Sequence, residues 1–240
     1  MAIYKRILLK LSGEALSGEQ RYGFDKQVIA SFCRQIKEIH EKGVQIALVV
    51  GGGNIFRGMT ASGGGMKRVT ADHMGMLATV INGLALQDEL EKSGMTARVL
   101  SAFAIEGIVE PFNTTNAVSY LETGQIVIFV GGTGNPYFST DTAASLRAAQ
   151  INADSILKGT KVDGVFDADP VKVGTAKKFD TITFNEMLSH SLKVMDSTAI
   201  AMCRENNIPI IVFNLTREGT LLRVINGEPV GTIVKEEANG

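Results

Sequence analysis

The sequence predicts an α/β protein in which helices cover both faces of a mostly parallel sheet. Two observations support this prediction. Short runs rich in valine, isoleucine and leucine alternate along the chain with amphipathic segments of helical length. Several of these runs are continuously apolar rather than alternating, which is typical of strands buried on both faces. Together the patterns favour a three-layer α/β/α sandwich.

Short apolar runs mark the expected strands. The first run, at residues 6–12, reads RILLKLS, and the second, at residues 44–50, reads VQIALVV. Both are rich in the aliphatic residues of a buried strand. The remaining strands are expected at 96–102, 125–131, 153–159, 208–214 and 231–236.

Amphipathic segments between these runs predict the helices. Residues 25–42 open at Asp25, which suits a helix N-cap, and stop before Gly43, which suits a helix C-terminus. Apolar residues recur along this segment at helical spacing, so one face of the helix is apolar. Further helices are expected near 69–92, 114–122, 140–151, 184–190 and 197–206.

We expect one domain over residues 1–240, built as two lobes that share a sheet. The first lobe covers about residues 1–150 and the second about residues 151–240. Residues 161–180 form a turn-rich and charged interruption in the second lobe. A loop of that length inside a compact domain is usually functional or mobile.

Composition excludes several classes of protein. Of the 240 residues, 45% are hydrophobic and 20% are charged, as expected of a soluble globular protein. The formal net charge is −1, so no basic excess favours a nucleic-acid partner. Cys33 and Cys203 lie far apart and outside any CxxC motif, which favours buried thiols in a reducing compartment. Because no apolar run has the length of a membrane span or of a signal peptide, we expect a cytoplasmic protein with no membrane partner.

Glycines follow three of the expected strands. They stand at Gly13 after the first strand, at residues 51–53 after the second and within residues 131–134 after the fourth. Parallel strands end at the same edge of a sheet, so these turns converge, and their bare amides can approach phosphate oxygens closely. Tight strand-to-helix turns are the alternative explanation for each glycine alone. The three together predict a phosphate or nucleotide ligand.

Two common nucleotide motifs are absent. Residues 13–20, GEALSGEQ, have the glycine spacing of a Walker A loop, but Glu19 and Gln20 stand where Lys and Ser or Thr are required. Neither GGGNIF nor GGTGNPYF completes the GxGxxG dinucleotide fingerprint. The three histidines form no HExxH motif or catalytic triad.

Lys10 interrupts the apolar first strand, with its side chain on the opposite face from the leucines beside it. A lysine in an apolar strand costs free energy unless an anion meets its ammonium group. Lys10 is therefore a candidate phosphate ligand. The alternative is an edge-strand lysine whose ammonium group reaches solvent.

Five segments carry a resemblance to a known family. They are KLSGE at 10–14, VVGGGNIFRG at 49–58, RVTADHMGMLATVINGLAL at 68–86, GGTGNPYFSTDTAA at 131–144 and LKGTKVDGVFDADP at 157–170. In this order and spacing they resemble the bacterial uridylate kinases of the amino acid kinase superfamily. The resemblance covers nearly the whole chain, and the motifs are long and jointly specific.

The resemblance implies transfer of the γ-phosphoryl group of ATP to UMP, giving ADP and UDP, within pyrimidine nucleotide biosynthesis. It also implies Mg²⁺ bound with ATP and a homohexamer. In many bacterial members GTP activates and UTP inhibits, so both are expected effectors. The acceptor would bind in the first lobe and ATP in the second.

The resemblance also assigns site residues, with no protein ligand assigned to the metal. The catalytic residues would be Lys10, Arg57 and Asp141. The ATP site would comprise Lys10, Ser12, Gly13, Gly53, Arg57, Thr160, Phe166 and Asp169. The UMP site would comprise Gly52, Asp72, Thr133, Gly134, Asn135, Pro136, Tyr137, Phe138, Ser139 and Thr140. The allosteric GTP segment would comprise Gly18, Glu19, Gln20, Arg21, Tyr22 and Gly23.

Three of these assignments have alternatives or departures. Asp141 stands where a helix begins and could instead be its N-cap. Asp72 would accept the ribose hydroxyls of UMP, but its position also suits a solvated residue in a first helical turn. Phe166 stands where the family often has Tyr, so it keeps a stacking face without the hydroxyl. The methionine- and leucine-rich helix at 74–90 could form a subunit interface or part of the monomer core.

Charge accounts for the expected mechanism. The second pKa of the UMP phosphate is ~6, so the attacking oxygen is already deprotonated at neutral pH. In-line transfer then needs no general base, and positioning and positive charge lower the barrier. Two alternatives remain at this point: another kinase of the superfamily, acting on glutamate, acetylglutamate, aspartate or carbamate, or a non-catalytic nucleotide sensor.

Overall fold

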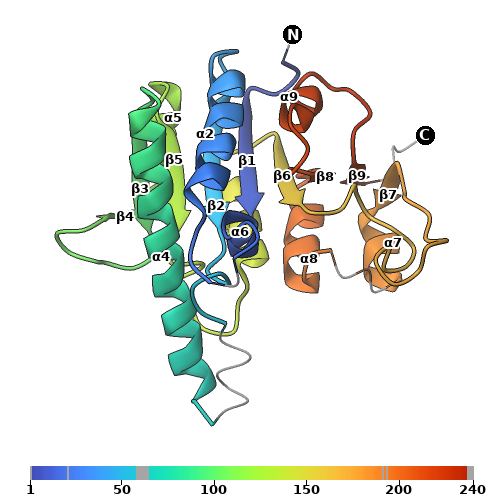
Figure 1. Cartoon of the computed structure of the whole chain (residues 1–240), viewed down its shortest axis with the longest axis horizontal. Helices are drawn as coiled ribbons and strands as arrows, with labels where there is room; N and C mark the ends of the chain where they lie inside the picture. The colour runs from blue at the N-terminus through green and yellow to red at the C-terminus, as the bar shows by residue number, and fades with distance from the viewer. Residues whose placement is uncertain (1, 21, 58–64, 191, 193, 237–240) are drawn as a thin grey trace.

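The structure, a computed structural model, describes residues 2–20, 22–57, 65–190, 192 and 194–236 (Figure 1). Within these residues nine strands form one sheet, in the order β4-β3-β5-β2-β1-β6-β8-β9-β7. Every recorded strand pair is parallel except β8 with β9. The predicted α/β class with a mostly parallel sheet is confirmed.

Figure 1 labels most of the elements along the chain. The strands are β1 (Arg6–Leu11), β2 (Gln45–Val50), β3 (Ala97–Ser101), β4 (Glu110–Pro111), β5 (Ile126–Val130), β6 (Ser155–Thr160), β7 (Thr181–Thr183), β8 (Ile210–Asn214) and β9 (Thr232–Lys235). The helices are α1 (Gly13–Leu16), α2 (Lys26–His40), α4 (Arg68–Lys92), α5 (Thr114–Glu122), α6 (Thr140–Gln150), α7 (Phe184–Ser189), α8 (Ser197–Glu205) and α9 (Thr220–Ile225).

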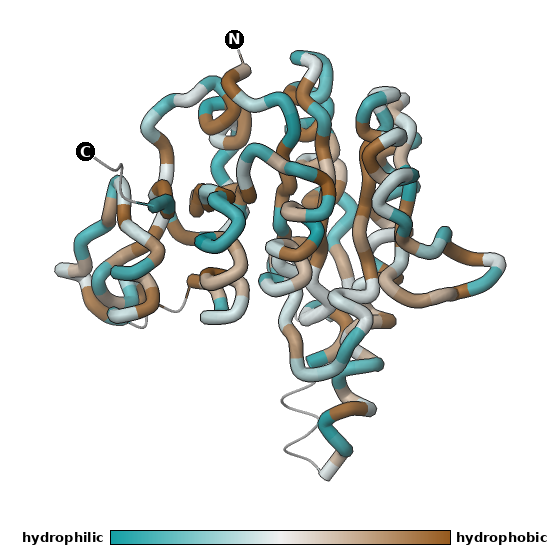
Figure 2. Tube along the Cα trace, turned by 180° about the vertical axis from the view of Figure 1, so that it is seen from behind, coloured by the Kyte–Doolittle hydropathy of each residue, from teal (hydrophilic) through white to brown (hydrophobic). Residues whose placement is uncertain are grey.

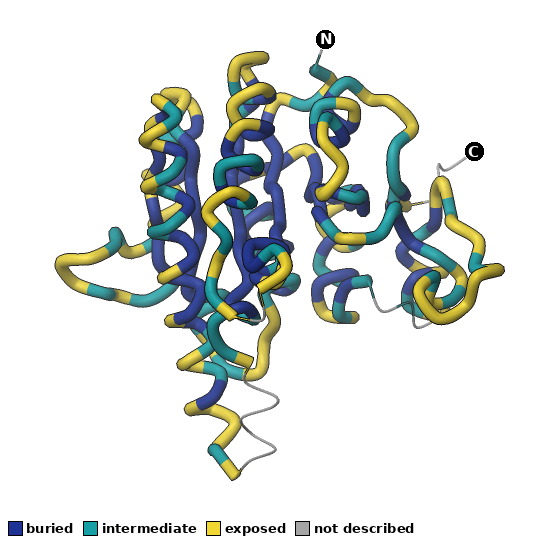
Figure 3. Tube along the Cα trace, in the orientation of Figure 1, coloured by how far each residue is buried: buried dark blue, intermediate teal, exposed yellow. Residues whose placement is uncertain are grey.

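Two apolar cores lie on opposite faces of the sheet. Leu9 packs in the core shared with α2, α4 and α9, whereas its neighbour Leu8 packs in the core shared with α5, α6, α7 and α8. Successive strand residues point to opposite faces, so a strand buried on both faces is apolar throughout. Figure 3 shows the strands as the buried centre, and Figure 2 shows hydrophobic residues along them. This is the predicted three-layer sandwich.

Strand β1 lies between β2 and β6. The strands that precede residue 150 extend from one side of β1, and those that follow extend from the other, so both halves of the chain share one sheet. Open α/β sheets bind ligands outside the carboxyl ends of their strands at such a switch point. A ligand-binding site is therefore expected at the carboxyl end of β1.

The predicted strands and longer helices are confirmed, with small shifts at their ends. The structure adds α1, β4, β7 and α9, which the sequence analysis did not include. Strands β4 and β7 contain 2 and 3 residues, too few to show a periodic pattern. The N-cap residue of helix α9 is Gly219, which has a φ of 76° and offers no side-chain cap. It therefore lacks the usual N-terminal signal.

Two further expectations concern residues away from the sheet ends. Cys33 and Cys203 are both buried and unpaired with each other, as predicted. Burial raises the pKa of Cys33 to about 12 and that of Cys203 to about 11.

Residues 161–180 contain no helix and no strand of the sheet, only the isolated bridge between Phe166 and Lys178. None of the helices seen in the described ranges is both long and apolar enough to cross a membrane.

Candidate active site

Two lysines face one carboxylate at the centre of the sheet. Lys10 on β1 and Lys158 on β6 are register partners, so their side chains leave the same face of the sheet side by side. Lys10 Nζ lies 2.6 Å from Asp141 Oδ1, and Lys158 Nζ donates a hydrogen bond to Asp141 Oδ2 at 2.8 Å. The exposed fractions of the three side chains are 9%, 10% and 16%. Asp141 thus bridges two buried ammonium groups.

Asp141 is not the N-cap of α6, so that alternative is wrong. Ser139 caps the helix, because its Oγ accepts hydrogen bonds from the backbone N–H groups of Asp141 and Thr142. Burial by itself would raise the pKa of Asp141, but the positive charges of Lys10 and Lys158 hold that pKa below its usual value. The carboxylate is ionised at neutral pH and orients both lysines.

Lys158 was missed by the sequence analysis. It stands in LKGT of β6 as Lys10 stands in LLKL of β1, a single lysine in an apolar strand, so the same argument could have found it. Burial, and then the charge of Lys10, lower the pKa of Lys158 to about 8. Its Nζ also donates to the carbonyl oxygen of Val194.

Asp196 was also missed. It caps α8 through a hydrogen bond from Ala199 N–H to Oδ1 at 3.0 Å. Ser139 Oγ donates to the same carboxylate, and Thr142 Oγ1 donates to Oδ1 at 3.0 Å. Asp196 therefore ties the N-terminus of α8 to that of α6. No local pattern marks this role, since an Asp before a helix predicts only a cap.

The glycine turns at the ends of β1 and β2 do converge. A Cβ on Gly13 would lie 2.4 Å from Asn54 Oδ1 and 2.7 Å from the carbonyl oxygen of Gly51. A Cβ on Gly52 would lie 2.7 Å from the carbonyl oxygen of Gly75 and 2.8 Å from Ala78 Cβ. Both positions therefore require glycine for packing, whatever ligand binds. Gly53 differs, because a Cβ there would meet nothing closer than Glu14 at 3.9 Å.

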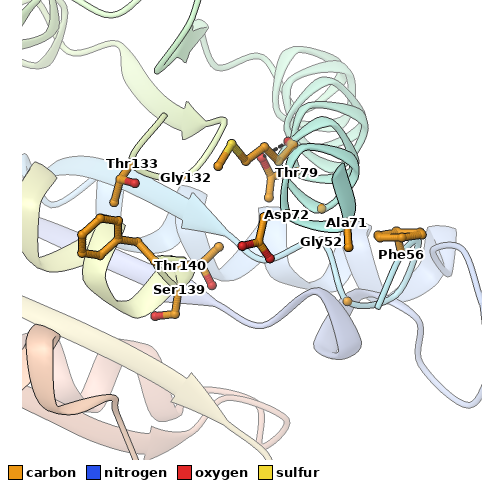
Figure 4. Close-up of a pocket in the computed structure, with 13 residues that line it drawn as sticks. Gly52, Phe56, Ala71, Asp72, Thr79, Gly132, Thr133, Ser139 and Thr140 are labelled. Atoms are coloured by element: carbon orange, nitrogen blue, oxygen red, sulfur yellow. Dashed lines mark hydrogen bonds between the residues drawn. The ribbon is translucent and has the colours of Figure 1, made fainter. Parts of the chain in front are cut away.

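A cavity of about 150 Å³ lies between the β2 turn, helix α4 and the segment after β5 (Figure 4). Figure 4 shows Asp72 pointing into the space between α4 and the Ser139–Thr140 segment. The cavity is lined by Gly52, Gly53, Phe56, Ala71, Asp72, Gly75, Met76, Thr79, Gly132, Thr133, Phe138, Ser139 and Thr140. Six of the ten residues expected at the UMP site therefore share one cavity with Gly53.

Asp72 already accepts hydrogen bonds in this structure. Arg68 Nε donates to both carboxylate oxygens at 2.8 Å, and the backbone N–H of Tyr137 donates to Oδ2 at 2.8 Å. The Arg68 guanidinium also lies 5.5 Å from the centre of the Tyr137 ring. Asp72 is therefore an anchor for the 133–138 segment rather than a solvated residue of the first helical turn.

The remaining residues of the expected UMP segment form a strained turn. Thr133 Oγ1 accepts from Asn135 N–H at 3.2 Å, and Gly134 N–H donates to the carbonyl oxygen of Gly131 at 3.0 Å. Pro136 follows, and Tyr137 has a φ of 72°, which a non-glycine residue adopts only at a cost of about 1–3 kcal/mol. Gly134, Asn135, Pro136 and Tyr137 do not line the cavity.

Arg57 lies on the surface near the β2 turn. Its Nη2 lies 2.6 Å from Glu14 Oε1, and both side chains are more than half exposed. Such surface pairs contribute little, so a phosphate can replace Glu14 as the partner. A second cavity, of about 360 Å³, is lined by Glu14, Ser17, Gly18, Gln20, Asn54, Arg57 and Lys161.

Two of the residues in the expected GTP segment border this second cavity, namely Gly18 and Gln20. Glu19 lines a separate cavity against α2, and the Tyr22 side chain is exposed. Gly23 N–H donates to the carbonyl oxygen of Asn54 at 2.9 Å. Arg21 lies outside the described residues.

The residues expected to bind ATP fall into two groups. Lys10, Ser12, Gly13, Gly53 and Arg57 lie at the ends of β1 and β2. Ser12 caps α1 by accepting from Ala15 N–H at 3.2 Å.

The second group belongs to the other half of the chain. Thr160 ends β6, and its Oγ1 donates to the carbonyl oxygen of Val162 at 2.7 Å. Phe166 lines a cavity of about 400 Å³ with Lys178 and Asn214. Asp169 is exposed and accepts from Val171 N–H at 3.0 Å. The cavity that Phe166 lines contains none of the residues of the first group.

The site contains carboxylates, but the described residues do not form a complete set of protein ligands for a metal ion. Nowhere in the described ranges do three His, Cys, Asp or Glu residues gather as a metal-binding group. Asp141 Oδ1 is buried and receives no well-directed hydrogen bond, although Lys10 lies beside it. A single buried carboxylate such as Asp141 would suit Mg²⁺ that arrives bound to nucleotide phosphates.

Comparison with known proteins places the chain in a family. The model of the amino acid kinase family matches residues 5–214. A uridylate kinase from Bacteroides thetaiotaomicron is 56% identical over 234 residues, which is 98% of this chain and 99% of that protein. The crystal structure of a UMP kinase from Bacillus anthracis superposes with a TM-score of 0.95 at 38% identity, covering 98% of this chain and 97% of that one.

Two further solved structures agree. The UMP kinase from Ureaplasma parvum has a TM-score of 0.91 at 41% identity, covering 97% of this chain and 99% of that one. The uridylate kinase from Archaeoglobus fulgidus has a TM-score of 0.75 at 27% identity, covering 98% of this chain and all of that one (100%). The chain therefore belongs to the amino acid kinase family, as its five motifs indicated.

Proposed function

We propose that this protein is an ATP:UMP phosphotransferase that acts in pyrimidine nucleotide biosynthesis. The observation that carries the proposal is the arrangement around the N-terminus of α6. Ser139 and Thr140 line the cavity that holds six expected UMP residues, and the next residue, Asp141, holds the Lys10–Lys158 pair. An acceptor cavity thus adjoins a cluster that presents positive charge at the carboxyl end of β1.

The reaction needs no proton acceptor. A UMP phosphate oxygen forms a bond to the γ-phosphorus of ATP, while the bond from that phosphorus to the β,γ-bridging oxygen breaks. ADP leaves with the electron pair. The attacking oxygen is already deprotonated near neutral pH, since the second phosphate pKa is ~6. Positioning and charge are what this chain supplies.

Each residue of the cluster has a role in this step. Lys10 stabilises the charge on the transferring phosphoryl group, and Lys158 supports it from the neighbouring strand. Asp141 positions both ammonium groups. When bound with ATP, Mg²⁺ would supply further positive charge to the reacting phosphates. Arg57 exchanges Glu14 for a phosphate oxygen.

Asp72 orients the acceptor. Its carboxylate accepts the ribose hydroxyls, as suits an acceptor-only group facing a diol. The 133–138 segment, which Asp72 anchors through Tyr137, lies over the base. ATP extends from Lys10 across the second half of the chain, where Thr160, Phe166 and Asp169 hold its nucleoside.

We propose a homo-oligomer, a hexamer by family resemblance, whose protomers meet through α4. Met76 is buried in the protomer, but Met74, Leu77 and Ile81 are 38%, 49% and 49% exposed. Their spacing places them on one face of the helix. A second copy of this chain is the occupant that would bury this apolar face.

We also propose that the protein is cytoplasmic. GTP and UTP are its proposed effectors, acting partly through residues 18–23.

The test is ADP formation by the purified protein with Mg·ATP and a panel of acceptors. The panel contains UMP, CMP, dUMP, GMP, AMP, glutamate, acetylglutamate, aspartate and carbamate. Turnover confined largely to UMP is the expected result. Turnover of an amino acid or carbamate would assign the chain to another branch of the family, and absence of turnover throughout would indicate a nucleotide sensor.

A further inference from the structure

Asn54 and Asn82 form a buried amide pair behind the β2 turn. Asn54 follows the three glycines, and Asn82 lies in the middle of α4, with exposed fractions of 3% and 0%. Asn54 Nδ2 donates to Asn82 Oδ1 at 3.0 Å, and Asn82 Nδ2 donates to Asn54 Oδ1 at 2.7 Å. The two side chains therefore bind each other reciprocally.

The second hydrogen of each amide binds a backbone carbonyl. Asn82 Nδ2 donates to the carbonyl oxygen of Gly51 at 2.7 Å. Asn54 Nδ2 donates to the carbonyl oxygen of Gly23 at 2.8 Å, and Gly23 N–H donates back to the carbonyl oxygen of Asn54 at 2.9 Å. All four amide hydrogens are used, so any rotation of either side chain breaks at least two bonds.

Burying these two amide groups costs free energy, so the pair is expected only where its hydrogen bonds hold a geometry that the protein needs. Asparagine is a poor helix former, and a buried amide is stable only when every donor finds a partner. Apolar residues at both positions would avoid these costs. A fully satisfied polar network instead holds its members in one arrangement. The Asn54–Asn82 pair holds the turn after β2, whose residues Gly52 and Gly53 line the acceptor cavity.

A second side chain of α4, that of Thr79, holds the turn after β5, the strand beside β2 in the sheet. Thr79 Oγ1 accepts from Gly131 N–H at 2.8 Å and donates to the carbonyl oxygen of Met76 at 2.7 Å. Side chains of α4 therefore hold the turns after both β2 and β5. The same helix carries Asp72. One rigid element thus sets the relative positions of three parts of the acceptor cavity.

We propose that Asn54 and Asn82 are positioning residues for phosphoryl transfer, acting as one unit that holds the residue 51–53 turn in its reactive position and links it to Gly23. The proposal rests on the proposed phosphotransferase activity. Neither side chain lines the acceptor cavity. Their effect passes through the backbone of the glycine turn, so a displacement near Gly23 changes the position of that turn.

The first test is Asn82→Asp, which keeps the size of the side chain but replaces its donor by an acceptor. A carboxylate oxygen would then face the carbonyl oxygen of Gly51 and Asn54 Oδ1. We expect kcat at saturating ATP and UMP to fall by about 10- to 100-fold, because small misplacements of reacting groups have effects of that size. Asn185→Asp makes the same change on the exposed face of α7 and should leave kcat unchanged.

A merely structural role predicts a different result. It would lower the melting temperature while kcat and both KM values of the folded enzyme, measured well below that temperature, stay at the wild-type values. That outcome would overturn the proposal. If Asn82→Asp fails to fold, Asn82→Ser provides the same measurement, since a serine hydroxyl is too short to bind both acceptors.

The second test asks whether the pair acts as a unit. We expect Asn54→Ala, Asn82→Ala and the double variant to lose similar fractions of kcat, because each single change already releases the turn. Losses that multiply in the double variant would show two independent effects and would overturn the paired role. Lack of wild-type turnover with UMP would instead refute the proposed function, so the two failures are distinguishable.

Discussion

Lys10 and Lys158 are register partners on adjacent parallel strands, and their ammonium groups bind different oxygens of the Asp141 carboxylate. Like charges side by side repel, so the pair is stable only with a counterion between its members. Two positive charges and one negative charge leave a net positive charge at the carboxyl end of β1. A phosphoryl group with several negative oxygens suits that charge.

Replacing Lys10 tests the centre of the cluster. Lys10→Ala should lower kcat by about 100- to 1,000-fold, the usual cost of removing one group that stabilises transition-state charge. Circular dichroism should show that the fold persists. Lys92→Ala, an exposed lysine at the end of α4, should leave kcat unchanged. A near-normal kcat for Lys10→Ala would remove that residue from the catalytic centre.

The pKa of Lys158 predicts a pH dependence. This pKa is lowered to about 8, so kcat/KM should fall as pH rises above about 8 and the free enzyme loses the ammonium charge. Lys158→Arg should move this fall to higher pH, since a guanidinium stays charged. A pH profile that is identical in the two proteins would contradict this assignment.

The same shift affects stability with a definite sign. The folded protein releases the Lys158 proton at about 8 and the unfolded chain at 10.5, so between these values the unfolded state binds more protons. The contribution of Lys158 to folding stability should therefore rise across that window and be least favourable below it. Denaturant titrations of wild type and Lys158→Met at several pH values measure this difference.

The three glycines near the β1 and β2 ends should separate packing from ligand binding. Gly13→Ala and Gly52→Ala introduce a Cβ within 3 Å of backbone atoms, so both should lower the melting temperature. Gly53→Ala has space in the free protein and should fold normally. We expect Gly53→Ala to raise KM for ATP or UMP through collision with phosphate. Wild-type kinetics in Gly53→Ala would show that no ligand approaches there.

Asp72 should act on the acceptor alone. Asp72→Asn keeps the shape of the side chain but weakens its bonds to Arg68, to Tyr137 N–H and to ribose hydroxyls. KM for UMP should rise by at least about tenfold, as expected for loss of charge-assisted hydrogen bonds, while KM for ATP stays near its wild-type value. Equal increases in both KM values would contradict the ribose assignment.

The exposed face of α4 should control assembly. Leu77→Asp places a charge on the apolar face that includes Met74 and Ile81. Light scattering after size exclusion should then show smaller particles than the wild type forms. Glu91→Ala, also exposed on α4, is the matched control. An unchanged molar mass in Leu77→Asp would exclude this face as the main interface.

Local sequence patterns were sufficient for most of the fold. Strand β1 and helix α2 were predictable because a buried strand is continuously apolar and a capped helix shows an N-cap residue such as Asp25 at its start. Strands as short as β4 and β7 contain too few residues for such a pattern. Lys10 was predictable as a candidate because its charge conflicts with its apolar strand.

The sequence by itself determined the α/β class, the glycine turns at the strand ends and the family, because each is encoded in short contiguous segments. Only the tertiary structure decided that Asp141 binds two lysines, that Asp196 joins α6 to α8 and that Asn54 binds Asn82. Asn54 and Asn82 are 28 positions apart in the chain, and Asp196 is 54 positions from Thr142. Side-chain contacts between distant segments depend on how the helices pack on the sheet, and no local periodicity records that packing.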